Sequence, residues 1–217
     1  MSGERTGPVA GVILAAGRST RMGRNKLLLE LGGESVLHRT VGVAAAAGLD
    51  PLVVVLGHEA ERVREELRGL RCAAVFNAAY SEGMSTSLRE GFRAVPDEAA
   101  CGVALLGDMP LVSAAMIAAL VDRFRAGRAT LVSSTYGGVV APPVLYGRAL
   151  FAELRALQAG DAGRQVVQRH RREAEEIAWP ASALADLDVP ADLERARAAL
   201  AAREATAAAA SKKGNAR

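Results

Sequence analysis

The sequence predicts an α/β fold, in which helices cover both faces of a mostly parallel, twisted sheet in a single domain. Apolar runs of strand length alternate with amphipathic stretches of helix length, as in right-handed strand–helix–strand crossovers. Half of the 217 residues are hydrophobic but only 4% are aromatic, which favours a core of Val, Leu, Ile and Ala. No Pro-, Ser- or Gly-rich linker divides the chain, whose length suits one well-buried domain.

Six apolar runs are expected to form strands: Val9–Leu14, Leu52–Leu56, Cys72–Phe76, Gly102–Leu106, Thr130–Ser134 and, at an edge, Ala174–Ala178. Ser35 and Ser113 are typical helix caps, and they predict helices that end near Ala47 and Phe124. Further helices are expected over 58–68, up to residue 95, and over 148–157, 162–171 and 191–202. Glycines and prolines in 137–147 predict an irregular hairpin or a segment on the substrate side.

The excess positive charge lies at the carboxyl terminus. The formal net charge of +3 is fully accounted for by Arg203, Lys212, Lys213 and Arg217 less Glu204. Nucleic-acid-binding surfaces usually carry a concentrated basic excess, so the neutral body is not expected to bind nucleic acid. We expect one domain over residues 1–202 and a disordered basic tail over 203–217.

The cysteines and the lengths of the apolar runs predict the cellular compartment of the protein. Cys72 and Cys101 lie far apart in apolar surroundings without metal-ligand spacing, which favours reduced core thiols over a zinc site. No signal peptide precedes the first strand, and no apolar run approaches the roughly 20 residues of a membrane span. We therefore expect a cytoplasmic protein that does not enter a membrane.

The segment from Val9 to Lys26 predicts a phosphate-binding loop at the carboxyl end of a buried strand. Small side chains at Ala15, Ala16 and Gly17 let a ligand approach the backbone closely. Cations follow at Arg18, Arg21, Arg24 and Lys26, and Lys26 is the only lysine outside the tail. The loop matches neither GxxxxGK[ST] nor GxGxxG, which disfavours a P-loop NTPase and a dinucleotide dehydrogenase.

A second motif, Gly107-Asp108-Met109-Pro110, follows a wholly apolar strand. A carboxylate at that position lies over the crevice where open α/β sheets bind ligands. Mg²⁺ prefers hard oxygen ligands, usually one or two protein carboxylates together with substrate phosphates. Asp108 is therefore a candidate Mg²⁺ ligand, although an Asp-x-Pro turn that precedes a helix also explains the motif.

Residues 14–26 match the signature LAAGxSxRMGxxK, and the chain thereby resembles the MobA-like nucleotidyltransferases, which have a Rossmann-like fold. Within them it resembles the molybdenum cofactor cytidylyltransferase branch. The resemblance implies that the loop wraps a nucleoside triphosphate through Leu14, Ala15, Ala16, Gly17, Arg18, Ser19 and Lys26. It also implies catalytic roles for Lys26, Arg21 and Asp108. Ala16 points to CTP, because the guanylyltransferase relatives carry LAGG where this chain has LAAG.

The segment Asn77–Gly91 resembles the family pattern NPxWxxGMxxSLxxG, with Ala78 in place of proline and Tyr80 in place of tryptophan. This resemblance implies that base or ribose contacts come from Asn77, Gly83, Ser85 and Ser87. Taken without the resemblance, the segment is only a loop followed by a helix that Ser85 would cap.

Near the carboxyl terminus, 185–193 reads ADLDVPADL and resembles the family's DIDTPEDL, with Val189 in place of threonine. This resemblance implies that Asp188 is a second metal ligand beside Asp108. A helix-capping role for Asp188 remains open.

The resemblance implies Mg²⁺-dependent transfer of CMP from CTP to a phosphorylated acceptor, in particular molybdenum-bearing molybdopterin, with release of pyrophosphate. The acceptor is open, because VVAPPVLY at 139–146 lacks the histidine of the family's GHP-like turn. Gly160–Arg164 resembles a family GDxGAR segment, and Arg164 is either an acceptor contact or a surface arginine. Two alternatives remain: a sugar or polyol phosphate acceptor, and a non-catalytic factor that delivers cofactor to a molybdenum hydroxylase.

Overall fold

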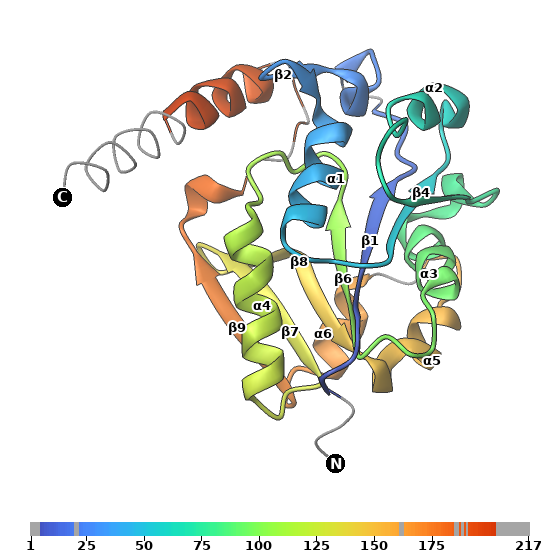
Figure 1. Ribbon diagram of the computed structural model, residues 1–217, viewed down its shortest axis with the longest axis vertical. Helices are drawn as coiled ribbons and strands as arrows, with labels where there is room; N and C mark the ends of the chain where they lie inside the picture. Colours follow the sequence, from blue (N-terminus) through green and yellow to red (C-terminus); the bar gives the residue numbers. More distant parts are fainter. Residues whose placement is uncertain are drawn as a thin grey trace.

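A computed structural model describes residues 5–19, 22–160, 163–184, 187, 189 and 191–202. Its main sheet has seven strands in the order β5-β4-β1-β6-β8-β7-β9 (Figure 1). The strands are β1 (Val9–Ala15), β4 (Leu52–Leu56), β5 (Ala73–Phe76), β6 (Cys101–Leu106), β7 (Leu131–Tyr136), β8 (Val139–Gly147) and β9 (Ala174–Trp179). All of them run in one direction except β8, which is antiparallel to both β6 and β7. The predicted α/β fold with a mostly parallel sheet is confirmed.

The carboxyl ends of three central strands meet at one edge of this sheet. Leu14 of β1 is paired in register with Val55 of β4 and with Leu106 of β6. The loops that follow these strands therefore begin side by side. This is the edge at which open α/β sheets bind their ligands.

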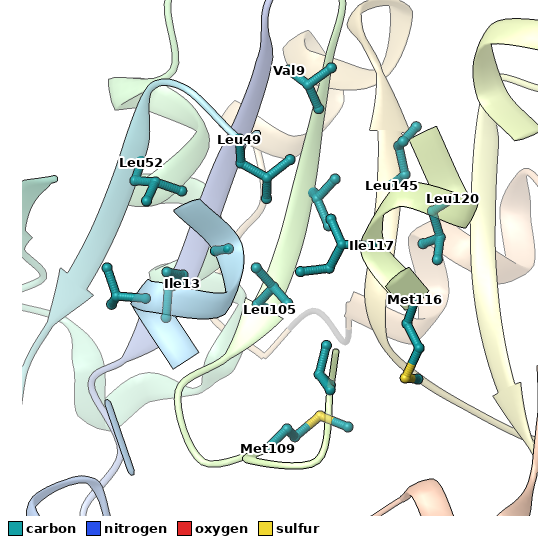
Figure 2. Packing of buried hydrophobic residues seen from close by; sticks show 14 of the residues in the cluster. Val9, Ile13, Leu49, Leu52, Leu105, Met109, Met116, Ile117, Leu120 and Leu145 are labelled. Atoms are coloured by element: carbon teal, nitrogen blue, oxygen red, sulfur yellow. The ribbon is translucent and has the colours of Figure 1, made fainter. Parts of the chain in front are cut away.

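One face of the sheet is covered by α1 (Val36–Ala46), α2 (Ala60–Glu65) and α4 (Ala114–Ala126). Ile117 and Leu120 of α4 join Ile13 and Leu105 of the sheet in one hydrophobic cluster (Figure 2). Burying these aliphatic side chains stabilises the fold by about 1.5–3 kcal/mol each.

The other face is covered by α3 (Met84–Ala94), α5 (Phe151–Arg155) and α6 (Gly163–Arg169). The ring of Phe92 on α3 lies against those of Tyr146 and Phe151, with centroids 5.6 and 5.3 Å apart. Helices therefore lie on both faces, as predicted.

The helix caps follow the sequence closely in α1 and α4. The hydroxyl of Ser35 accepts from the His38 backbone N–H at 3.1 Å, and that of Ser113 accepts from Met116 at 3.3 Å. Helix α2 is shorter than the expected 58–68, since Glu59 has a φ of 51°, which no right-handed helix contains. Its last turn tightens into i to i−3 hydrogen bonds at Leu67 and Arg68.

The irregular hairpin expected over 137–147 is formed: β8 is inserted between β6 and β7, and its pairing with β7 shifts register. Gly137 and Gly138 have φ values of 56° and 86°, and two successive positive φ values are what a tight two-residue hairpin turn requires. The register shifts between Ser133 and Ser134, where the hairpin bends.

A small third cluster joins two segments that are distant in sequence. The two-stranded sheet of β2 (Glu30–Leu31) and β3 (Glu34–Ser35) packs with the helix at 191–202 through Leu31, Leu193 and Ala196. The Arg197 side chain donates to the Glu30 carbonyl at 3.1 Å. The expected tail over 203–217 lies outside the described residues.

Both cysteines have free thiols, as expected. Cys101 is buried on β6, and burial raises the pKa of its thiol to about 12. Among the described residues, none of the helices is long and apolar enough to span a membrane.

Candidate nucleotide-binding site

A cavity of about 390 Å³ lies where β1 and β6 end, and we call it the central cavity. The predicted site residues that line it are Leu14, Ala15, Ala16, Gly17, Arg18, Ser19, Lys26, Gly83, Ser87 and Asp108. Their side chains come from the loop after β1, the start of α3 and the turn after β6. The structure thus brings together most of the positions that the sequence singled out.

The loop after β1 is held in an unusual backbone path. Ser19 has a φ of 51° and Gly23 a φ of 66°, both in the left-handed region. The Ser19 hydroxyl accepts from the Lys26 backbone N–H at 3.1 Å, which closes the loop on itself. Gly17 is not left-handed, and a Cβ built on it would meet nothing within 4 Å. The backbone at Gly17 is therefore open to a ligand.

Lys26 and Asp108 are brought together at the floor of this site. The Lys26 ammonium group forms an ion pair with the Asp108 carboxylate, and the two side chains are only 15% and 14% exposed. Lys26 begins a short 3-10 helix (Lys26–Leu28) that the Asn25 side chain caps by accepting from Leu27 N at 3.1 Å. A cation and a carboxylate that are this buried interact more strongly than an exposed pair.

The turn that carries Asp108 is fixed by contacts that the sequence did not reveal. Gly107 N donates to the Leu14 carbonyl at 2.9 Å, which ties the end of β6 to the end of β1. Thr40 of α1 donates to the Gly107 carbonyl at 3.1 Å. A Cβ on Gly107 would lie 3.2 Å from the Leu14 carbonyl oxygen, so only glycine fits without displacement.

Tyr80 and Gly57 are further site residues that the sequence analysis did not assign. The Arg18 guanidinium carbon lies 5.5 Å from the centre of the Tyr80 ring, a cation–π contact at the cavity wall. A Cβ on Gly57 would lie 2.6 Å from Tyr80 Cβ and 2.7 Å from Ala16 Cβ. Gly57 therefore allows these two lining residues to approach. The available signal was a glycine directly after a buried strand, as at Gly107.

Asn77 and Ser85 do not line the central cavity. Asn77 is buried, and its amide nitrogen donates to the hydroxyls of Thr86 and Ser87 at 2.8 and 2.9 Å. The side-chain oxygen of Asn77, Oδ1, accepts from the Ala79 backbone N–H at 3.0 Å. Asn77 thus fixes the start of α3, which presents Ser87 to the cavity. Ser85 lies inside α3 rather than capping it, and donates to the Gln158 carbonyl at 3.0 Å.

Three predicted positions cannot be placed. Arg21 and Asp188 lie outside the described residues, as does Asp161 of the Gly160–Arg164 segment. Leu187, the neighbour of Asp188, lines the central cavity. The backbone of Arg164 belongs to α6, with its side chain outside the description.

The donor set around Asp108 can be tested against a divalent cation. Within the described part of the chain, no group of three His, Cys, Asp or Glu residues could hold a metal ion. Asp108 is the only carboxylate among the described residues that line the central cavity. One carboxylate fits Mg²⁺ or Mn²⁺ where phosphate oxygens and water complete the shell, which is the usual arrangement with nucleotides.

A second cavity of about 460 Å³ adjoins the central one and shares Leu14, Met84 and Leu106 with it. We call it the apolar cavity. Its other walls come from β8, α3 and α6, and include Pro142, Tyr146 and Val167. Ser85 lines this cavity and not the central one.

The sequence profile of the MobA-like NTP transferase domain matches residues 11–177. This chain belongs to that family. The expected membership is confirmed, whereas the molybdenum cofactor cytidylyltransferase branch is a narrower assignment that the match does not address. Members of this family are nucleotidyltransferase enzymes.

Two curated relatives differ in how much of their length this chain covers. The purine catabolism protein PucB of Bacillus subtilis is 28% identical over 202 residues, which are 88% of this chain and 96% of PucB. The bifunctional protein GlmU of Methylibium petroleiphilum is 35% identical over 143 residues, which are 64% of this chain. The match spans only 30% of the length of GlmU.

Among solved structures, Rv0371c of Mycobacterium tuberculosis H37Rv is 31% identical and superposes with a TM-score of 0.77. The match covers 88% of this chain and 98% of that one. A second structure of Rv0371c, with a TM-score of 0.72, is a complex with manganese. A protein with a similar fold and 30% sequence identity therefore binds manganese.

Proposed function

We propose that this NTP transferase moves CMP from CTP to the phosphate of molybdenum-bearing molybdopterin and releases pyrophosphate. The observation that carries the proposal is the Lys26–Asp108 ion pair beside the open backbone of Gly17. A cation for phosphate oxygens and a carboxylate for a metal stand together there, at the ligand-binding edge of the sheet. This is the pair of functions that nucleotidyl transfer needs.

In the proposed reaction an acceptor phosphate oxygen attacks the α-phosphorus of CTP, and the bond to the bridging oxygen of pyrophosphate breaks. Lys26, Arg18 and Arg21 hold the triphosphate and neutralise the negative charge that grows on the leaving group. Asp108 and Asp188 would hold Mg²⁺, which neutralises phosphate charge when bound. Positioning and charge neutralisation then suffice, without a covalent enzyme intermediate.

The choice of CTP rests on Ala16. Its methyl group lines the central cavity and packs where a Cβ on Gly57 would lie only 2.7 Å away. The methyl group thus narrows the cavity at a position that is glycine in the guanylyltransferase relatives. A smaller pyrimidine is favoured over a purine by this steric restriction.

The apolar cavity supports an acceptor that carries a planar ring system. Its walls are mainly aliphatic and aromatic, and it opens beside the central cavity at Leu14. A polyol phosphate would leave its hydroxyl groups against these walls without hydrogen-bond partners, which is costly. We expect the ring faces of the molybdopterin heterocycle to pack against these walls, with its polar edges and its phosphate turned towards the central cavity.

The alternative acceptor is a sugar or polyol phosphate, and the observation that favours it is the sequence at 139–146, which lacks the family's GHP-like turn. The non-catalytic alternative is delivery of cofactor to a molybdenum hydroxylase. Lys26 and Asp108 are both present and form an ion pair, which favours an enzyme over a non-catalytic delivery factor.

Pyrophosphate release with each of the four NTPs and Mg²⁺ tests the proposal, with molybdenum-bearing molybdopterin or a polyol phosphate as the acceptor. We expect turnover with CTP and the molybdopterin, and partial use of GTP by Ala16→Gly. Turnover with GTP alone would exclude the CTP assignment, and turnover only with the polyol phosphate would exclude the acceptor. Asp108→Ala should abolish turnover, whereas a delivery factor would keep its cofactor-loading activity in that variant.

A further inference from the structure

A third, polar hollow of about 570 Å³ adjoins the central cavity at Arg18 and Ser19, and we call it the outer hollow. One wall is the loop after β1, with Arg24 and Asn25. The other is the connection from β4 into α2, with His58, Glu59 and Arg62. Neither Arg24 nor any residue of α2 lines the central cavity.

The charge in the outer hollow is predominantly positive. Three guanidinium groups, those of Arg18, Arg24 and Arg62, face a single carboxylate, that of Glu59. Arg62 is ion-paired with Glu59. Arg18 and Arg24 have no carboxylate partner within the described part of the chain. Arginine forks of this kind suit phosphate oxygens, which they bind through paired hydrogen bonds.

Glu59 occupies the position of an anion among these groups. Arg62 and the neighbouring His58, whose Nε2 lies 4.0 Å from a Glu59 oxygen, both face the carboxylate. The Asn25 side chain, and after it Arg62, lowers the pKa of the Glu59 carboxyl below its ordinary value. Asn25 itself is 6% exposed, and its Nδ2 is buried without a hydrogen bond of normal geometry to the described residues. This donor is only partly used by the protein.

The backbone of both walls is strained. Ser19 and Glu59 both have a φ of 51°, and they are the only non-glycine residues with positive φ in the described chain. Such conformations persist only where the surroundings enforce them, and they concentrate at ligand sites. Here the two strained residues line one hollow from its two walls.

We propose that the outer hollow binds a diphosphate group, which displaces Glu59 from Arg62 and accepts from the buried amide nitrogen of Asn25. The group is either the β,γ-diphosphate of the bound nucleotide or the pyrophosphate that leaves the central cavity past Arg18. The inference rests on nucleotidyl transfer itself and not on the identity of the base or the acceptor.

Titration calorimetry of the full chain with inorganic pyrophosphate and Mg²⁺ tests this site without any acceptor. Arg62→Gln should raise the Kd about tenfold, since it removes a charged donor. Glu59→Gln should instead lower the Kd several-fold, because it removes the competing carboxylate. Arg68→Gln, an exposed arginine paired with Glu65 outside both cavities, is the matched control and should leave the Kd unchanged.

The expected changes in Kd have opposite signs in Arg62→Gln and Glu59→Gln, whereas damage to the fold would weaken binding in both variants. An unchanged Kd in both Arg62→Gln and Glu59→Gln would overturn the proposal, as would a loss of affinity in both. Arg24→Gln provides a second test on the other wall and should weaken binding as Arg62→Gln does. Because pyrophosphate binding needs neither CTP nor molybdopterin, its outcome is independent of the proposed substrates.

The two sources of the diphosphate are distinguished with a non-hydrolysable α,β-methylene analogue of CTP. If Arg62→Gln weakens the binding of pyrophosphate but not that of the CTP analogue, the outer hollow binds the released product. If it weakens both ligands equally, the hollow holds the β,γ-diphosphate of the bound nucleotide.

Discussion

The Lys26 ammonium group is ion-paired with the Asp108 carboxylate, although the two residues belong to motifs at opposite ends of the first half of the chain. The pair is largely shielded from water at the carboxyl ends of β1 and β6. A triphosphate offers Lys26 new oxygens, and a metal offers Asp108 a new cation. In the proposed reaction this ion pair would therefore be exchanged for contacts with phosphate and metal.

Lys26→Met and Asp108→Asn should each lower the rate of pyrophosphate release at least about 100-fold, because each removes charge stabilisation at the reacting phosphates. Each should also cost about 1 kcal/mol in the free energy of unfolding, since the ion pair is lost while the remaining charge stays partly buried. The double variant should regain stability in urea unfolding but not activity. Arg93→Gln, which breaks an exposed ion pair with Glu90, serves as the control. A rate within twofold of wild type in Lys26→Met would contradict this prediction.

Gly17→Ala should fold normally yet bind NTP at least about tenfold more weakly, since its methyl group would enter the open space of the central cavity. Gly42→Ala is a matched control. It also meets nothing within 4 Å, but it lies in the middle of α1. There the substitution should stabilise the protein by about 0.5–1 kcal/mol and leave NTP affinity unchanged. Thermal unfolding with and without nucleotide measures both effects, and an unaltered affinity in Gly17→Ala would refute the assignment.

Asn77→Ala should lower the free energy of unfolding by about 2–3 kcal/mol, because it removes its hydrogen bonds to the buried hydroxyls of Thr86 and Ser87 and to the half-buried Ala79 N–H. Ser87→Ala, which loses one of these bonds, should cost about 1 kcal/mol. Urea unfolding of both variants gives the comparison. A loss of nucleotide affinity in Asn77→Ala without a loss of stability would instead indicate a direct contact with the nucleotide.

Glu153 should make stability depend on acidic pH. Burial raises the pKa of its carboxyl, but hydrogen bonds from His170 at 2.6 Å and Arg169 at 2.8 Å outweigh burial and lower the pKa below its ordinary value of 4.5. A lowered pKa in the folded state contributes stability above pH 4.5 that is lost as the pH falls through the folded value. Glu153→Gln should therefore be less stable than wild type by about 1 kcal/mol at pH 7. That difference should shrink below pH 4.5 in urea unfolding; a difference that stays constant with pH would rule out the ion pairs as its source.

The sequence by itself determined the fold class and many of the positions that line the central cavity. Both follow from local rules. An apolar run that ends at Ala15, Ala16 and Gly17 predicts a buried strand followed by an accessible backbone. The apolar run before Asp108 likewise predicts a buried strand, which ends at the ligand-binding edge of the sheet. Since parallel strands end at a common edge, the two motifs were expected at the same edge of the sheet, whereas the sheet order made β1 and β6 adjacent. The caps at Ser35 and Ser113 were equally local, and both were correct.

Contacts between distant segments were decided only by the tertiary structure. The bond from Thr40 to the Gly107 carbonyl, the approach of Ala16 to Tyr80 over Gly57, and the outer hollow all join segments whose spacing carries no pattern. The role of Asn77 likewise depends on which way its side chain turns once α3 is packed. For the loop from Leu14 to Lys26, the small and cationic residues were enough to predict a phosphate-binding loop from the sequence. The packing of α2 and of the turn after β6 decided which groups face them, because ion pairs and close approaches depend on three-dimensional distance and not on separation along the chain.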